Sequence, residues 1–155
     1  MQRTEERESS KLRSKIIKKV RSDASKLLKS GLPIKVLSSS DALSQVTNLV
    51  LTELINDKKR LQNNPSGEFL RIVPWCLEDE ISEGFKVFFE NENCESGGIK
   101  LLKSISINDI DELAKELSLP PTKHGLPKVI SFLKPFESRD PGVKFSLLKS
   151  LRRDP

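Results

Sequence analysis

The stretch that most constrains the fold is residues 83–117, because it combines two alternating apolar patterns with a clear helix start. The first alternating set is Phe85, Val87 and Phe89, and the second is Ile99, Leu101, Ile105 and Ile107. A period of two is typical of strands that bury one face of a sheet. Between the two sets lies a polar loop whose Gly97-Gly98 pair suits the return of a hairpin. The pattern therefore predicts an antiparallel hairpin over residues 84–107.

A helix is expected directly after this hairpin. Asn108 is a good N-cap residue, and the carboxylates that follow suit the positive end of a helix dipole. The apolar residues of the segment fall at helical spacing: Ile110, Leu113, Ala114 and Leu117. We expect this apolar side to pack on the hairpin.

Two long helices are predicted before the sheet. The first covers Glu5 to Lys29, which contains neither Gly nor Pro and is followed by Gly31 as a stop signal. Its apolar stripe is Leu12, Ile16, Val20, Ala24 and Leu27. The second begins at the capping residues 38–41 and reaches about Gln62. Its stripe is Leu43, Val46, Val50, Leu54 and Leu61.

The fold class predicted from these patterns is α+β and mainly helical. Two long N-terminal helices pack with a small antiparallel sheet, to which residues 68–73 are a candidate third strand, and short C-terminal helices follow. One short helix is expected to begin at Pro127 and to end at Pro135. The predicted organisation is a frayed arm over 1–10, a single domain over 11–135 and a basic amphipathic tail over 136–155.

Charge is distributed unevenly along the 155 residues, whose net charge is +5. Residues 1–35 hold 11 Lys or Arg against 4 Asp or Glu, and residues 119–155 hold 8 against 3. Residues 66–118 reverse the balance, with 5 against 12. Basic ends either meet an anionic partner or fold against the acidic middle, and the sequence leaves both alternatives open.

Residues with catalytic or metal-binding potential are few. The single histidine, His124, lies in a loop rich in Pro and Gly, and Cys76 and Cys94 match no zinc-ligand spacing. The two cysteines are expected to be reduced thiols, with a disulfide between them as the alternative. The carboxylates of residues 78–80 are expected to face solvent. The sequence therefore favours a non-enzymatic protein without a metal or other cofactor.

A protein-interaction or regulatory subunit of an intracellular complex is the function that the sequence favours, with nucleic acid as a further candidate component of that complex. The expected compartment is cytoplasmic or nuclear, because the chain shows neither a signal peptide nor a membrane-spanning segment. The partner, another protein or a second copy forming a dimer, would pack against the first helix. The predicted partner-helix interface is Leu12, Ile16, Val20 and Leu27.

The alternative function is sequence-independent binding of RNA or DNA. Basic faces of the first two helices would contact phosphates, and such binding weakens steeply with salt because each neutralised phosphate releases counterions. The predicted phosphate-binding residues are Arg13, Lys15, Lys18, Lys19, Arg21, Lys58, Lys59 and Arg60. No exposed aromatic residues are interleaved with these cations in the sequence, so the sequence does not predict recognition of individual bases.

Overall fold

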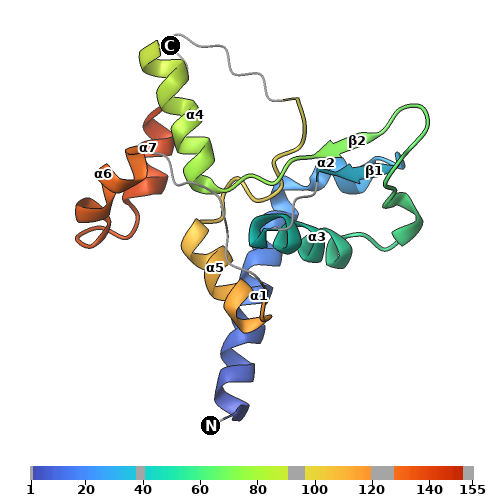
Figure 1. The fold of residues 1–155 in the computed structure, drawn as a ribbon, viewed down its shortest axis with the longest axis horizontal. Coiled ribbons are helices and arrows are strands. Elements are labelled where there is room, and N and C mark those ends of the chain that lie inside the picture. Colours follow the sequence, from blue (N-terminus) through green and yellow to red (C-terminus); the bar gives the residue numbers. More distant parts are fainter. Residues whose placement is uncertain (1, 38–40, 91–96, 120–127, 152–155) are drawn as a thin grey trace.

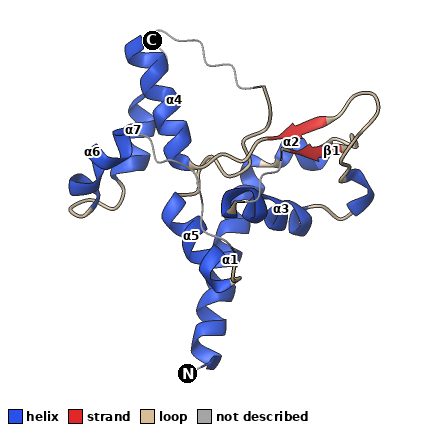
Figure 2. Cartoon of the chain, in the orientation of Figure 1, coloured by secondary structure: helices blue, strands red, loops and turns tan. Residues whose placement is uncertain are grey.

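The computed structural model describes residues 2–37, 41–90, 97–119 and 128–151 (Figure 1). The described residues are mostly helical, with a small two-stranded parallel sheet (Figure 2). The elements in chain order are α1 (Gln2–Asp23), α2 (Ser25–Lys29), β1 (Ile34–Val36), α3 (Ala42–Leu54), the 3-10 helix η1 (Lys58–Arg60), β2 (Leu70–Ile72), α4 (Leu77–Glu90), α5 (Ile107–Glu116), α6 (Lys128–Glu137) and α7 (Val143–Leu151). The coarse α+β prediction is thus confirmed.

The predicted first helix is present as α1 and α2, which follow each other almost without interruption. Only Ala24 separates them, and it still accepts a hydrogen bond from Leu28 N and donates one to Val20 O, both at 2.9 Å. Helix α1 includes residues 2–10, for which the sequence predicts a frayed arm. The first part of α1 projects away from the other elements (Figure 1).

Helix α3 begins as predicted but ends earlier. Asp41 is its N-cap, with Oδ1 accepting a hydrogen bond from Ser44 N at 3.1 Å. The helix ends at Leu54 and not near Gln62, because the backbone becomes extended at Ile55, which is itself buried. The basic residues that follow form η1 instead, capped by Asp57.

The predicted antiparallel hairpin over 84–107 is wrong. Residues 85–89 belong to α4, in which Leu77, Ile81 and Phe85 follow helical spacing. The short sequence around Phe85 fits both the period of a strand and that of a helix. Leu77 and Ile81, in the preceding turns of α4, are buried at helical spacing, and residues 85–89 continue that helix. Ile99 forms only an isolated parallel bridge with Ile72.

The sheet that does form joins two segments far apart in sequence. β1 pairs in parallel with β2, with Ile34 opposite Leu70 and Val36 opposite Ile72. β2 lies within the predicted strand 68–73, whereas the sequence predicts no strand at β1. A parallel pair needs a long crossover, and α3 lies within that connection.

The remaining helices differ from prediction in their ends. Helix α5 is capped by Ser106, whose Oγ accepts a hydrogen bond from Asp109 N at 3.3 Å, and not by Asn108. Its apolar side packs on α1 and α3 in place of a hairpin.

Pro135 lies inside α6 and does not end it. Helix α7, in the predicted basic tail, packs chiefly on α4.

Two separate groups of buried apolar side chains result. The main core lies between α1, α2, α3, α5 and the sheet, and it includes Val20, Leu51 and Ile110. A smaller cluster lies between α4, α6 and α7, and its buried members among the described side chains are Leu77, Ile81, Leu133 and Leu148.

Candidate functional site

The predicted partner-helix interface on α1 and α2 is largely occupied by the chain itself. Ile16, Val20 and Leu27 are at most 1% exposed and belong to the main core. Leu12 is half-buried and packs against the same core. An apolar stripe is therefore present where the sequence predicts it, but α3 and α5 already cover it.

The predicted phosphate-binding residues of α1 fall into two groups. Lys15, Lys18 and Arg21 are exposed, and their spacing of three places them along one side of the helix. Arg13 and Lys19, in contrast, already interact within the chain. Arg13 pairs with Glu53 of α3, and Nζ of Lys19 lies 4.1 Å from the centroid of the Phe145 ring. Burial lowers the pKa of Lys19, which remains partly accessible.

The second predicted basic segment forms η1, where Lys58 and Lys59 are exposed. Arg60 has a structural role, because its side chain reaches back to the end of α2. Its Nη2 donates to Leu27 O and its Nε donates to Leu32 O, each at 3.0 Å. These bonds satisfy a carbonyl group at a helix C-terminus, a group that has no partner within the helix.

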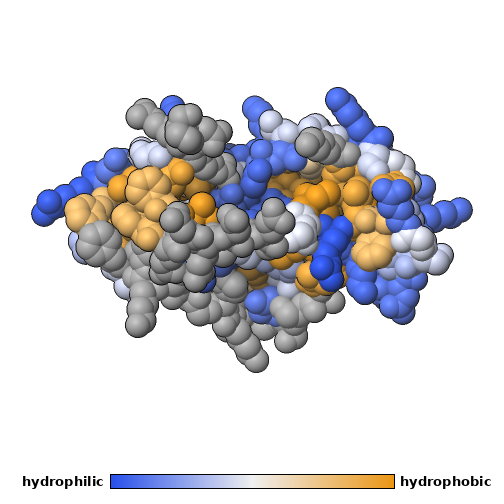
Figure 3. All heavy atoms as spheres, turned by 90° about the horizontal axis from the view of Figure 1, so that it is seen from above, coloured by the Kyte–Doolittle hydropathy of each residue, from blue (hydrophilic) through white to orange (hydrophobic). Residues whose placement is uncertain are grey.

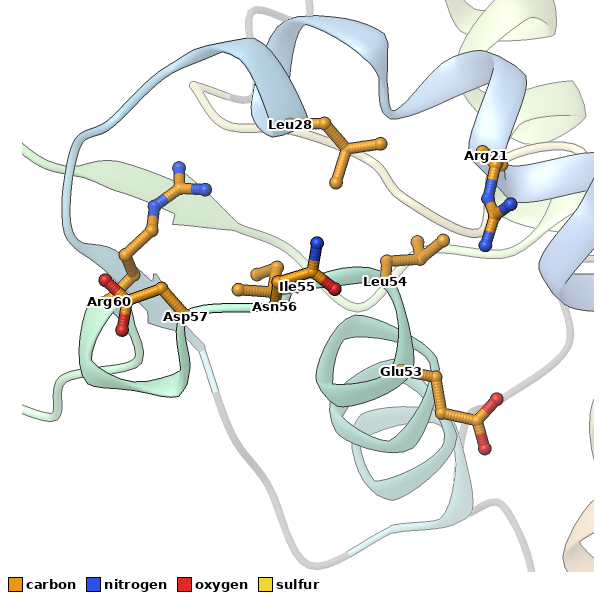
Figure 4. A pocket seen from close by; sticks show the side chains of 8 residues that line it. All are labelled: Arg21, Leu28, Glu53, Leu54, Ile55, Asn56, Asp57 and Arg60. Atoms are coloured by element: carbon orange, nitrogen blue, oxygen red, sulfur yellow. The ribbon is translucent and has the colours of Figure 1, made fainter.

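An open hollow of about 540 Å³ lies where α1, α2 and the end of α3 meet (Figure 4). We call it the α2–α3 hollow. Its lining residues are Arg21, Leu28, Glu53, Leu54, Ile55, Asn56, Asp57 and Arg60. The structure thus brings together one cation from each predicted basic segment, Arg21 and Arg60, although they are far apart in sequence.

An exposed apolar surface occupies the last turns of α4. Val87, Phe88 and Phe89 are 46%, 63% and 67% exposed. The Phe89 ring stacks on Phe85, with centroids 5.4 Å apart, and meets Phe88 edge to face at 5.0 Å. We call these four residues the α4 aromatic end. Hydrophobic side chains gather at this side of the molecule, at the left of Figure 3.

Sequence reasoning missed the α4 aromatic end because it assigned Phe85, Val87 and Phe89 to the buried face of a strand. A signal for the correct assignment exists in the spacing from Leu77 through Ile81 to Phe85 and Phe89, which is four residues at each step.

The start of α4 carries a buried polar network. Glu78 and Asp79 are 0% and 7% exposed, so the prediction that they face solvent is wrong. Glu78 Oε1 accepts a hydrogen bond from Lys144 Nζ at 2.7 Å, and Glu78 Oε2 accepts one from Ile107 N at 2.8 Å. Lys144 also pairs with Glu137 at 2.9 Å. One carboxylate therefore connects α4 with the first turn of α5 and with α7.

Hydrogen bonding outweighs desolvation at Lys144. Burial alone lowers the pKa of this ammonium group, but its bonds to Glu78 and Glu137 raise the pKa by more, so the net shift is upward. The lysine therefore stays charged in the folded protein, as a pair with buried carboxylates requires.

A second cation, Lys100, holds the segment before α5 against α4. It pairs with Glu83 and Glu80, and its Nζ lies 4.3 Å from the centroid of the Trp75 ring. Trp75 Nε1 donates to Glu80 at 2.9 Å. Trp75 is half-buried, and its ring is covered by this lysine instead of being open for base stacking.

No arrangement typical of catalysis is found in the described part of the chain. Cys76 is a buried free thiol whose pKa is raised by burial and by the nearby Asp79 and Glu78 carboxylates, so it stays protonated. Within the described ranges, no group of three or more His, Cys, Asp or Glu side chains is placed to hold a metal ion. His124 and Cys94 lie outside the described residues.

Among the helices of the described residues, none has both the length and the apolar character needed to cross a membrane. Comparisons of the chain with models of protein families, with curated proteins and with solved structures find no match.

Proposed function

We propose that this protein is a non-enzymatic protein-interaction subunit that binds a helix of a partner protein along the α4 aromatic end. The proposal keeps the function class that the sequence favours and moves the binding surface from α1 to α4. It rests on one observation: among the described residues, the other helices cover the first turns of the apolar stripe of α4 and leave its last turns exposed.

The covered half of α4 ends near Gly84. Lys144 at the start of α7 contacts Glu78 at the start of α4, so the two helices run side by side in the same direction. A Cβ atom placed on Gly84 would lie 3.2 Å from Leu151 Cδ1, at the last residue of α7. Phe88 and Phe89 lie beyond this point and are the most exposed large apolar side chains among the described residues.

A helix is the occupant that this surface fits best, because the covered half of the same stripe is already packed against helix α7. A partner helix would continue that packing over the last turns of α4. Burying a fully exposed Phe side chain contributes about 1.5–3 kcal/mol, and Phe88 and Phe89 are about two-thirds exposed, so the two rings can contribute the central contacts of a larger interface.

The test is quantitative capture of partners from the native cell with three forms of the protein. The double variant Phe88→Ser/Phe89→Ser removes both rings from the aromatic end. Phe69→Ser is the matched control, because Phe69 is also exposed, at 38%, but lies just before β2. We expect one partner to be retained by wild type and by Phe69→Ser and lost from the double variant.

Capture of the same proteins by all three forms would contradict the proposal. Sedimentation of the purified protein separates a foreign partner from a second copy. We expect a monomer, whereas a dimer that dissociates in the double variant would show that the occupant is another copy of this chain.

A second candidate function, binding of a nucleic-acid backbone, is favoured by the exposed row of Lys15, Lys18 and Arg21 on α1. Lys58 and Lys59 on η1 are exposed as well. The test is binding of a random RNA oligomer across a salt series. The double variant Lys15→Gln/Lys18→Gln should lower the magnitude of the slope of log affinity against log salt by about 1.4 if both lysines contact phosphates of the single-stranded oligomer. An unchanged slope would exclude phosphate binding by this face of α1.

A further inference from the structure

The α2–α3 hollow is lined by charged side chains and by apolar side chains, one of which, Leu28, is accessible to solvent. Figure 4 shows Arg60 and Arg21 toward opposite ends of the hollow, with Leu28 and Leu54 between them. Leu28 is 37% exposed and so remains accessible from solvent. The two guanidinium groups are therefore separated by apolar surface and do not form one continuous basic patch.

Arg60 is already held in place for binding. The bonds from its Nε and Nη2 to the carbonyls of Leu32 and Leu27 use only part of the guanidinium, which has five N–H donors. The remaining donors can pair with an anion. Because the side chain is ordered before a ligand arrives, little further conformational entropy is lost on binding.

Of the two acidic residues of the lining, Glu53 has a counter-ion, whereas Asp57 accepts a hydrogen bond from a backbone N–H group and keeps its negative charge. Glu53 pairs with Arg13, and Asp57 Oδ1 accepts a hydrogen bond from Lys59 N at 3.1 Å. Arg21, in contrast, is exposed and forms no ion pair with any residue in the described ranges. The Arg21 end of the hollow is thus cationic, whereas at the other end Arg60 belongs to η1, which the Asp57 carboxylate caps.

Asn56 adds a different kind of group to the centre of the hollow (Figure 4). Its carboxamide provides both a donor and an acceptor, and the side chain makes no hydrogen bond to another described residue. A peptide bond of a ligand presents the complementary pair, one N–H and one C=O.

From these features we infer that the α2–α3 hollow binds a short acidic peptide segment of another protein, in which an apolar residue lies between two carboxylates. The carboxylates pair with Arg21 and Arg60, the apolar side chain rests on Leu28, and Asn56 pairs with the peptide backbone. This site is separate from the α4 aromatic end and does not depend on the function proposed for it.

A peptide fits the hollow better than a nucleic-acid backbone does. A nucleic acid carries a negative charge at every phosphate, and continuous charge would meet Glu53, Asp57 and the negative end of the α3 dipole. A peptide places its charges only at the two arginines. The lining also contains no aromatic ring on which a base could stack.

The test measures binding of a fluorescent peptide in which glutamate and leucine alternate, with a glutamine–leucine peptide as the uncharged control. Arg21→Gln is the diagnostic variant, because Arg60 also supports the fold. Lys11→Gln is its matched control, since Lys11 is an exposed cation of the same helix that does not line the hollow. The double variant Phe88→Ser/Phe89→Ser tests whether the α4 aromatic end contributes to binding of the peptide.

We expect the acidic peptide to bind wild type and the glutamine peptide to bind at least about fivefold more weakly at the same salt concentration. Arg21→Gln should weaken binding of the acidic peptide by about fivefold, whereas Lys11→Gln and the α4 double variant should leave it within about twofold of wild type. Three results would each overturn the inference: no binding of the acidic peptide, equal loss in Arg21→Gln and Lys11→Gln, or displacement of the bound peptide by an RNA oligomer acting on the same arginine.

Discussion

The two buried clusters of this protein are stabilised in different ways. The main core joins α1, α2, α3, α5 and the sheet almost entirely through apolar side chains. Among the described side chains, the cluster of α4, α6 and α7 has four buried apolar residues, and a lysine and a glutamate of α7 and α4 are buried as well, at 3% and 0% exposure. The small cluster thus relies on a charged pair where the main core relies on area.

That difference shows how a small cluster can be positioned uniquely. Apolar contacts are not directional, so we expect the pairing of Lys144 with Glu78 and Glu137 to select the placement of α7. No buried side-chain nitrogen or oxygen in the described residues lacks a hydrogen-bond partner. Since a buried charge without a partner is costly, the pair makes any other placement of α7 unfavourable.

Removing the lysine should have the largest effect on the small cluster. Lys144→Met leaves Glu78 buried without its counter-ion, and breaking a buried pair in this way costs about 3–5 kcal/mol. Chemical denaturation measures the loss, and hydrogen exchange should show α7 opening before α3. Lys149→Met is the control, because Lys149 is an exposed cation of the same helix. Equal effects of the two variants would contradict the role of the buried pair.

Truncation of apolar residues should affect the two clusters unequally. Leu51→Ala opens a cavity in the main core, where the residue is 0% exposed, and should cost about 2–5 kcal/mol. Leu148→Ala removes a side chain that is 8% exposed and has a thinner cover, so its cost should lie at or below the lower end of that range. Urea denaturation of both variants checks the order. A larger loss for Leu148→Ala would mean that apolar packing, and not the charged pair, dominates the small cluster.

The segment that joins the two clusters contains a position that requires glycine. Gly98 has a φ of 149°, and a Cβ atom there would lie 2.5 Å from Val73 Cγ2. Gly98→Ala should therefore destabilise the protein by about 1–3 kcal/mol. Gly97→Ala is the matched neighbour, since a Cβ atom at Gly97 meets nothing within 4 Å. Thermal unfolding of both variants tests the difference, and similar transition temperatures would exclude a specific requirement at Gly98.

The smallest effect is expected only at alkaline pH. The folded-state pKa of Lys144 is raised above its ordinary value of 10.5, so its stabilising contribution is complete below that pH and is lost as pH rises through the raised value. The difference in unfolding free energy between wild type and Lys144→Met should accordingly shrink above pH 10.5 and stay constant from neutral pH up to about pH 9. A difference that declines already between pH 7 and 9 would assign the titration to another group.

Much of the main core could be predicted from sequence, because its signals are local. The stripe of Ile16, Val20 and Leu27 along α1 and α2, the start of α3 after the candidate caps 38–41 and the apolar side of α5 are each specified by residues close in sequence. What the stripe of α1 packs against could not be predicted. Its partners, α3 and α5, lie far along the chain, so an internal contact and a contact with another protein give the same pattern.

The small cluster and the candidate surfaces were harder to predict for the same reason. Glu78 resembles a solvent-facing acid in its local sequence, and its partner Lys144 lies 66 residues away. The α2–α3 hollow also depends on distant residues, because Arg60 reaches Leu27 across 33 positions. At residues 85–89 the short pattern fits both a strand and a helix, and the helix is indicated only when the spacing is followed back to Leu77 and Ile81.

The link between Glu78 and Lys144 has a consequence for how the chain is made. During synthesis on the ribosome, α4 and α5 emerge well before Lys144 does, so Glu78 must stay hydrated until the last helix appears. We therefore expect the junction of α4 and α5 to settle late, and a nascent chain that stalls before residue 144 to expose the side of α4 that α7 covers in the folded protein.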